Sequence, residues 1–456
     1  MSRLYSLMIA SIACSGIVTA AFLPSAAATT GTAAKPATKS VNSNLAVSAR
    51  PGAIELGSIA GSSPPTYADC EAHFGLPCYG PVQIQNAYGT PALYARGVEG
   101  QGQTIVIVES FGSPTIASDL ATFDEAYGLP APPSLKIIQP AGTFTWTGTR
   151  EQYGWAGETT LDVEYAHAIA PKANILLVET PVSETEGVTG FPQIVSAEEY
   201  VIDHHLGGVI SQSFDATEGT FATKRSLLDL RGAYIDAYRH HVTVLSATGD
   251  SGATDSEADG SSLYPYRVIG WPASDPLVTA VGATQVSVDA NGSHISPDVA
   301  WDNSGGGVSS VFSRPEYQNS VAPAVGTERG IPDISMNGSC DSGGVITYLS
   351  FTGTGSWELS CGTSESTPLF AGIVALSDQV AHHWLGLINP AIYRLNSRHA
   401  PGIVDVTSGN NSQTFTQDGV TYTVQGYSAG PGYDLVTGVG TVYAPDFVPE
   451  LARAAR

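Results

Sequence analysis

Short apolar runs of strand length alternate with amphipathic helical patterns through the middle of the chain. Because strands buried on both faces are continuously apolar and the intervening helices can cover both faces, this alternation predicts an α/β fold with a doubly wound, mostly parallel sheet. The expected strands and following helices are Thr104–Val108 and Ile116–Tyr127, Asn174–Val178 and Ile194–His205, Gly208–Ser213 and Ser226–His240, then strands Val242–Ala247 and Val278–Val281. Sites in such sheets lie at the carboxyl ends of strands. Glu109 and Asp250 fall at such ends.

A small-residue turn, Gly362-Thr363-Ser364, leads into an uninterrupted apolar run from Leu369 to Leu376. The run is too uniformly apolar for a surface helix, so we expect a buried one. The first turn of a helix presents unpaired N–H groups and the positive end of the helix dipole, which would stabilise an oxyanion. Ser364 is therefore a candidate nucleophile. The alternative is that Ser364 and Ser366 only cap a core helix.

Two carboxylates, Glu158 and Asp162, lie four residues apart in the segment GETTLDVEYAHAIAP. On a helix this spacing places both on one face, with their β-carbons about 5–6 Å apart. Like charges this close repel unless they share a proton, which is what a base working at acid pH requires. The alternative is a solvated acidic face, but the surrounding alanines and apolar residues favour a buried helix.

The sequence G-T-S-x-S-T-P with its apolar helix, followed by LINPAIYRL at Leu387–Leu395, resembles the serine-motif region of the sedolisins. These serine-carboxyl peptidases share a fold with the subtilisins. The resemblance extends from about Tyr79 to the C-terminus, and it implies a subtilisin-like fold. The matching motifs also include GGGVSSVFSRPEYQ and RGIPDIS.

The resemblance implies a role for each candidate residue. Ser364 matches the family's nucleophile, Glu158 its general base, Asp162 the carboxylate that orients the base, and Asp250 the aspartate of the oxyanion hole. Asp250 must be protonated when it acts, because an ionised carboxylate would repel the developing oxyanion. Glu109 matches an acidic residue that extends this network in some members, and a purely structural buried carboxylate is an equal alternative.

No histidine among the ten lies in a motif like that of the subtilisin base. At pH 4 a histidine with a pKa of about 6.5 would be neutral well under about 1% of the time, whereas a glutamate with a pKa of about 4.3 would be roughly one-third ionised. A carboxylate base therefore predicts activity in the acid range.

The C-terminal segment contains VDVTSGN and then YSAGPGYDLVTGVGTV. Carboxylates and glycines in this pattern suit a Ca²⁺ ion, which takes six or more oxygen ligands. The family's calcium loop implies one structural ion, and a plain glycine-rich turn is the alternative. The implied ligands are Asp405, the carbonyl of Val406, the carbonyls of Gly430 and Gly432, and Asp434.

The amino-terminal residues indicate secretion. Residues 1–28 combine Arg3, an apolar segment and the small-residue site Ala26-Ala27-Ala28, which is typical of a signal peptide. A lipoprotein anchored through Cys14 is a less favoured alternative, because no leucine stands in the three residues before it. We interpret residues 29–78 as a low-complexity linker or short pro-segment, without room for the large prodomain common in sedolisins. Residues 79–456 are expected to form the peptidase domain, including the calcium loop.

Four cysteines remain after removal of the signal, an even number that suits disulfides in an oxidising compartment. Of the three connectivities, Cys70–Cys78 and Cys340–Cys361 are the economical choice, because the first pair closes a short loop and the second brackets an expected hairpin. The spacings match no zinc pattern.

Forty-two acidic residues against nineteen basic ones argue against nucleic acid or an anionic membrane as a partner.

These patterns predict a secreted, extracellular, acid-active endopeptidase, expected to be monomeric, that cleaves proteins or peptides through an acyl-enzyme. The alternatives are a tripeptidyl exopeptidase of the same family, and a catalytically silent homologue that binds peptides or polymer. Two departures from the family's pattern fall near the expected cleft: Cys361 replaces the usual Ser or Gly, and Phe214-Asp215 replaces an aromatic-Gly pair.

Overall fold

The computed structural model describes residues 54–455 except 62 and 342. The expected signal peptide and the first part of the expected linker lie outside these residues. Most predicted elements form. The main sheet follows the order β11-β10-β8-β6-β3-β5-β4, with β14 also paired to β10, and every pairing is parallel except that of β11. Its strands are β3 (Thr104–Ser110), β4 (Leu135–Ile138), β5 (Asn174–Thr180), β6 (Val209–Gln212), β8 (Thr243–Ala247), β10 (Thr279–Gln285), β11 (Val299–Ala300) and β14 (Ile334–Asn337).

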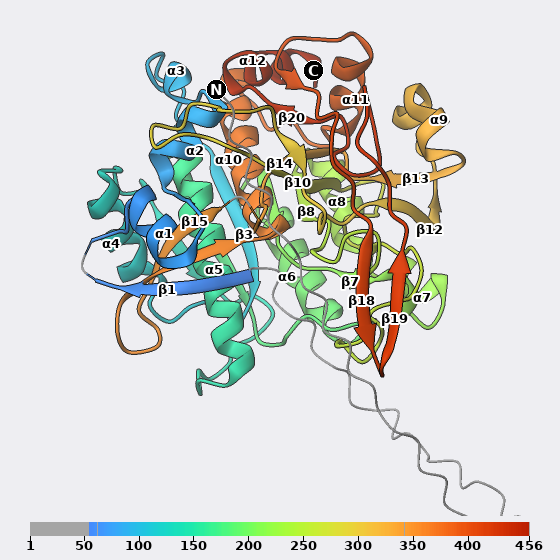
Figure 1. The fold of residues 1–456 in the computed structure, drawn as a ribbon, viewed down its shortest axis with the longest axis horizontal. Helices are drawn as coiled ribbons and strands as arrows, with labels where there is room; N and C mark the ends of the chain where they lie inside the picture. Colours follow the sequence, from blue (N-terminus) through green and yellow to red (C-terminus); the bar gives the residue numbers. More distant parts are fainter. Residues whose placement is uncertain (1–53, 62, 342, 456) are drawn as a thin grey trace, which may run out of the picture. The chain divides into compact units, whose positions relative to one another are not determined.

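Helices cover both faces of this sheet, which confirms the predicted fold class (Figure 1). Successive side chains of β3 alternate between the two faces, as the geometry of a strand requires. Ile105 and Ile107 pack with α4 (Ile116–Tyr127), α5 (Arg150–Ile169) and α10 (Thr363–Ala381). Val106 and Val108 pack with α6 (Phe191–Asp203) and α8 (Gly232–His240).

The helices α5 and α10 lie in direct contact on one face of the sheet, and a glycine allows their close approach. A β-carbon at Gly372 of α10 would lie 2.6 Å from the β-carbon of Ile169 and 3.3 Å from the carbonyl oxygen of Ala166, both in the last turns of α5. A larger residue there would force the two helices apart. This contact sets the position of α5 relative to the helix that carries Ser364.

The predicted helix Ser226–His240 is wrong as a single element, because the chain forms two helices there. They are α7 (Lys224–Leu228) and α8, separated by Asp229 to Arg231. Arg231 turns its guanidinium toward the buried carboxylate of Asp275 and donates a hydrogen bond of 2.9 Å to it. The break thus lets Arg231 pair with a buried carboxylate that would otherwise lack a cationic partner.

A second sheet has the order β1-β16-β15-β2. Its strands are β1 (Ile54–Ala60), β2 (Cys78–Tyr79), β15 (Gly344–Leu349) and β16 (Ser356–Cys361). The prediction of a low-complexity linker over residues 29–78 needs correction in its last part, because β1 and α1 (Tyr67–Phe74) form there. The physical reason is that β1 gains backbone hydrogen bonds by pairing antiparallel with β16.

Both predicted disulfides, Cys70–Cys78 and Cys340–Cys361, are present. The second attaches the segment before β15 to the last residue of β16, directly before the Gly362-Thr363-Ser364 turn.

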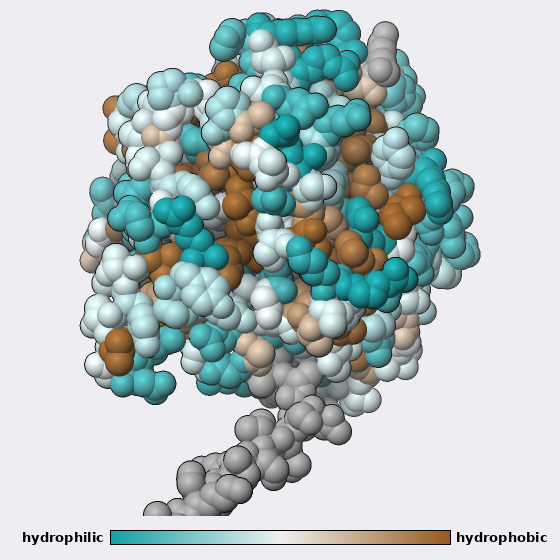
Figure 2. Space-filling view, turned by 90° about the vertical axis from the view of Figure 1, so that its right-hand side faces the viewer, coloured by the Kyte–Doolittle hydropathy of each residue, from teal (hydrophilic) through white to brown (hydrophobic). Residues whose placement is uncertain are grey.

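Large hydrophobic side chains exposed on the described surface are scattered, and on the face shown in Figure 2 hydrophobic groups lie between hydrophilic ones. Within residues 54–455, no helix has the length and apolar character needed to cross a bilayer.

Candidate active site

Ser364 is the second residue of α10, and the chain reaches it through a turn that requires glycine. Gly362 has a φ of 122°, in the region that favours glycine, and its N–H donates to the carbonyl of Gly338 over 2.8 Å. Ser364 is fully buried, and its Oγ finds no hydrogen-bond partner among the described residues. A buried hydroxyl without a partner is costly in a structural role. The geometry therefore favours a reactive serine over a helix cap.

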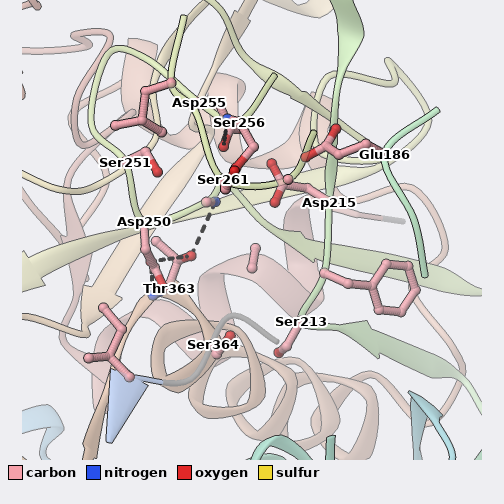
Figure 3. A pocket seen from close by; sticks show the side chains of 16 residues that line it. Glu186, Ser213, Asp215, Asp250, Ser251, Asp255, Ser256, Ser261, Thr363 and Ser364 are labelled. Atoms are coloured by element: carbon pink, nitrogen blue, oxygen red, sulfur yellow. Dashed lines mark hydrogen bonds between the residues drawn. The ribbon is translucent and has the colours of Figure 1, made fainter. Parts of the chain in front are cut away.

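Asp250 follows β8 and faces the first residue of α10. Its Oδ1 accepts hydrogen bonds from the backbone N–H of Thr363 at 2.7 Å and from the Thr363 hydroxyl at 2.9 Å (Figure 3). Its Oδ2 is buried without a partner in the described structure. Burial raises the pKa of Asp250 to about 7, although the two hydrogen bonds from Thr363 act in the opposite direction. In acid the carboxyl is therefore protonated, and Oδ2 is the oxygen left to carry the proton.

Glu158 and Asp162 lie on α5 and are completely buried, together with their neighbours Leu161 and Tyr165. This burial rules out the solvated acidic face. Asp162 accepts hydrogen bonds from the hydroxyl of Ser213 on both of its oxygens, at 3.0 and 2.8 Å. Burial raises the pKa of Asp162 to about 8, and the hydrogen bonds from Ser213 lower it in part.

Glu109, at the carboxyl end of β3, completes a cluster of three buried carboxyl groups. Burial raises its pKa well above the ordinary value, and the charges of Asp162 and Glu158 raise it further. Both oxygens of the Glu109 carboxyl are buried without a hydrogen-bond partner among the described residues. Because ionised carboxylates this close together in a buried cluster would repel one another, we expect the cluster to hold at least one proton.

A cavity of about 370 Å³ connects the two groups of residues. It is lined by Ser364, Asp250 and Ser213, and the last of these also donates to Asp162 on α5. The nucleophile candidate, the oxyanion candidate and the hydroxyl bonded to the carboxylate pair thus meet at one cavity, at the carboxyl ends of β6 and β8. This is the position expected for a parallel sheet.

Sequence reasoning did not identify three residues of this site. Ser213 lies just beyond β6, and its position at the carboxyl end of a parallel strand was the available signal. Thr363 lies in the serine turn itself. Glu365, directly after Ser364, is buried and accepts a hydrogen bond of 2.6 Å from Asn337, and burial raises its pKa to about 8. Nothing in the sequence indicated that Glu365 would be buried.

The implied calcium ligands come from two segments that meet in space. The N–H of Gly432 donates to Asp405 Oδ2 at 2.9 Å, and the N–H of Gly430 donates to Asp434 Oδ2 at 3.0 Å. The space beside both glycines is open, since a β-carbon built on either meets nothing within 4 Å. In the described structure no cluster of three or more His, Cys, Asp or Glu side chains could hold a metal. Two carboxylates with nearby backbone carbonyls are nonetheless a donor set of the kind Ca²⁺ accepts.

Comparison with known proteins agrees with this arrangement. Residues 144–420 match the model of the Subtilase family. Kumamolisin from Bacillus sp. (strain MN-32) is 32% identical over 376 residues, which cover 80% of this chain and 62% of kumamolisin. The chain belongs to the sedolisin family. Tripeptidyl-peptidase sed4 of Aspergillus fumigatus is 29% identical over 398 residues, covering 73% of this chain and 59% of that protein. Human tripeptidyl-peptidase 1 is 28% identical over 350 residues, covering 73% and 57%.

A solved structure of Pseudomonas sedolisin, a serine-carboxyl proteinase complexed with two molecules of pseudo-iodotyrostatin, superposes with a TM-score of 0.69 at 23% identity. The match covers 84% of this chain and all of that one, and it shows the same fold. The chain spans about three-fifths of the length of the curated relatives it matches.

Proposed function

We propose that this sedolisin is an acid-active endopeptidase that works through an acyl-enzyme on Ser364. The observation that carries the proposal is the position of the buried, unpartnered Ser364 hydroxyl next to Thr363, whose N–H and hydroxyl hold Asp250. This arrangement supports Ser364 as the nucleophile and the protonated carboxyl of Asp250 as a donor, because both residues line one cavity near the start of α10. Such preorganised donors stabilise charge that develops only in the transition state.

In the proposed first step, Ser364 Oγ attacks the carbonyl carbon of the scissile bond and its proton passes to Glu158. Asp250 donates a hydrogen bond from Oδ2 to the oxyanion. Glu158 then gives the proton to the leaving amine, and the acyl group remains on Ser364. Water, deprotonated by Glu158, then attacks the ester carbonyl. The bond from the acyl carbon to Ser364 Oγ breaks, Glu158 returns the proton to that oxygen, and the acyl group leaves as a free carboxylic acid. Asp162, held by the Ser213 hydroxyl, is the carboxylate that shares the charge of the base.

Tripeptidyl exopeptidase activity is the second candidate, because two of the relatives are named tripeptidyl-peptidases. The two activities give different products from the same substrate.

The parent and the Ser364→Ala variant should each be incubated with an unfolded protein at pH 3–5, and the products sequenced by mass spectrometry. Internal cleavage by the parent, lost in Ser364→Ala, supports the endopeptidase. Successive release of amino-terminal tripeptides would replace it with the exopeptidase. Equal cleavage by parent and variant would contradict Ser364 as the nucleophile.

We also propose one structural Ca²⁺ held by Asp405, Asp434 and the carbonyls of Val406, Gly430 and Gly432. When bound, the ion would neutralise the two carboxylates and hold the two segments together.

Secretion is a further proposal. It rests on the signal-like residues 1–28, which lie outside the described structure, and agrees with the two disulfides, since these persist in oxidising compartments.

A further inference from the structure

One wall of the cavity beside Ser364 is acidic and is formed by residues that the proposed chemistry does not use. Glu186, Asp215 and Asp255 all line it (Figure 3). They come from three separate loops, after β5, after β6 and after β8. Glu184 is buried behind them, and both of its carboxylate oxygens lack a hydrogen-bond partner among the described residues.

The protein makes room for the Asp215 carboxylate with two glycines. A β-carbon on Gly270 would lie 1.8 Å from Asp215 Oδ2, and a β-carbon on Gly249 would lie 3.1 Å from the same atom. Neither position could carry a side chain without displacing the carboxylate.

The acidic wall has no cationic partner. Among the described residues that line the cavity, none is Lys, Arg or His. Burial, reinforced by the charge of Asp255, raises the pKa of Asp215 well above its ordinary value and that of Glu186 to about 8. Asp215 Oδ2 is buried without a hydrogen-bond partner in the described structure, and the nearby charge of Asp255 makes a second ionisation there costly. In the described structure the wall thus keeps protons that an entering cation would displace.

The position of the reacting groups determines which part of a substrate reaches this wall. In the acyl-enzyme the carbonyl carbon is bonded to Ser364 Oγ, and its oxygen lies at Asp250. Both residues line the cavity, and the Ser364 hydroxyl and Asp250 Oδ2 are buried polar atoms that lack partners there. The residue that contributes this carbonyl is therefore the one whose side chain can enter the cavity and contact Asp215.

We infer that the cavity selects peptides with Lys or Arg as the residue that donates the scissile carbonyl, and that Asp215 is a specificity-determining residue for this reaction. The inference rests on the proposed function of the same site. An ammonium or guanidinium group would pair with Asp215 and neighbouring carboxylates, and a proton would leave the wall as it binds.

The test uses three peptides of identical sequence except at this residue, which is Lys, norleucine or Glu. Norleucine keeps the length of the lysine chain without its charge. We expect kcat/KM for the Lys peptide to exceed that for the norleucine peptide by at least about 10-fold in the parent. The ratio of kcat/KM for the Lys peptide to kcat/KM for the norleucine peptide should fall by about 10-fold in Asp215→Asn. It should also fall in Glu186→Gln, which provides the test if Asp215→Asn does not fold. Asp203→Asn, an exposed carboxylate at the end of α6, should keep the parent ratio.

A Lys peptide that is cleaved no faster than the norleucine peptide, or a Glu peptide that is cleaved fastest, would overturn the inference while leaving the peptidase intact. A ratio unchanged in both folded variants would also overturn it. If the parent cleaves none of the three peptides and no unfolded protein, the proposed function itself is wrong, and this inference is overturned with it.

Discussion

Asp250 and Thr363 are joined by two hydrogen bonds, both to the same carboxylate oxygen. One comes from the first backbone N–H of α10 and the other from the Thr363 hydroxyl, which itself accepts from the N–H of Gly249 at 3.2 Å. The end of β8 and the start of α10 are therefore connected directly. Because Oδ1 is occupied, the proton of the acid form resides on Oδ2, the oxygen free to bind a substrate.

The pH dependence of activity tests this relationship. Asp250 must be protonated to donate, and its pKa is raised to about 7, so activity should be present in acid and be lost as pH rises through about 7. Asp250→Asn keeps a donor that does not titrate, so its activity should extend to higher pH, with kcat/KM lower by up to about 10²–10³-fold. The measurement is kcat/KM from pH 3 to 9 for both proteins.

Two outcomes would change the assignment of groups. A slower Asp250→Asn variant with an unchanged profile would mean that the Glu158–Asp162 pair sets the alkaline limb. A parent optimum near pH 8, with a titration near about 6.5, would indicate a histidine base and contradict the proposed mechanism.

Removal of the Ser213 hydroxyl should shift the acid limb of the same profile. The two hydrogen bonds from Ser213 stabilise the ionised form of Asp162. The acid limb of kcat/KM belongs to the first ionisation of the coupled carboxyl cluster rather than to Asp162 alone. Ser213→Ala should make that first ionisation harder and move the acid limb toward higher pH by about one pH unit, the value of one charge-assisted hydrogen bond. Ser377→Ala is the matched control, since its buried hydroxyl donates only to the Ile373 carbonyl within α10. An acid limb at the parent position in Ser213→Ala would contradict this role.

The fold should be more stable in acid than at neutral pH. Burial raises the pKa of Asp162, Glu186 and Glu365 to about 8 each and that of Asp250 to about 7. Between about pH 4 and 8 the folded chain then binds more protons than the unfolded chain, so stability falls as pH rises. The melting temperature of Ser364→Ala, which avoids self-digestion, should decrease from pH 4.5 to 7.5. A constant or rising melting temperature would show that these carboxyl groups ionise freely in the folded protein.

Chelation should destabilise the protein if the C-terminal loop binds Ca²⁺. The ion stabilises only the folded state, so excess chelator should lower the melting temperature of Ser364→Ala. Asp434 also accepts hydrogen bonds from the N–H groups of Val436 and Thr437, so Asp434→Ala should lower it even without chelator. The decisive readout is that Asp434→Ala loses both the chelator response and bound calcium by mass spectrometry, while Asp203→Asn keeps both. If parent protein incubated with Ca²⁺ holds no bound calcium and melts identically with and without excess chelator, the site is excluded.

The sequence by itself determined those features that depend on local pattern. Mostly apolar runs identified β3, β5, β6 and β8, because strands buried on both faces read as nearly continuous hydrophobic stretches. The four-residue spacing of Glu158 and Asp162 placed them on one helical face, and glycine before Thr363 and Ser364 indicated the turn into a buried helix. These are properties of neighbouring residues, which the chain determines before it folds.

Only the tertiary structure decided which residues distant in the sequence meet. Ser213 and Asp162 are 51 positions apart, and Thr363 and Asp250 are 113 apart. The pairing of β1 with β16 depends on a free sheet edge, and Arg231, in the break between α7 and α8, pairs with the buried Asp275. The acidic wall likewise joins carboxylates from three loops. Such contacts depend on strand order and on the close approach of packed elements, which no short stretch of sequence specifies.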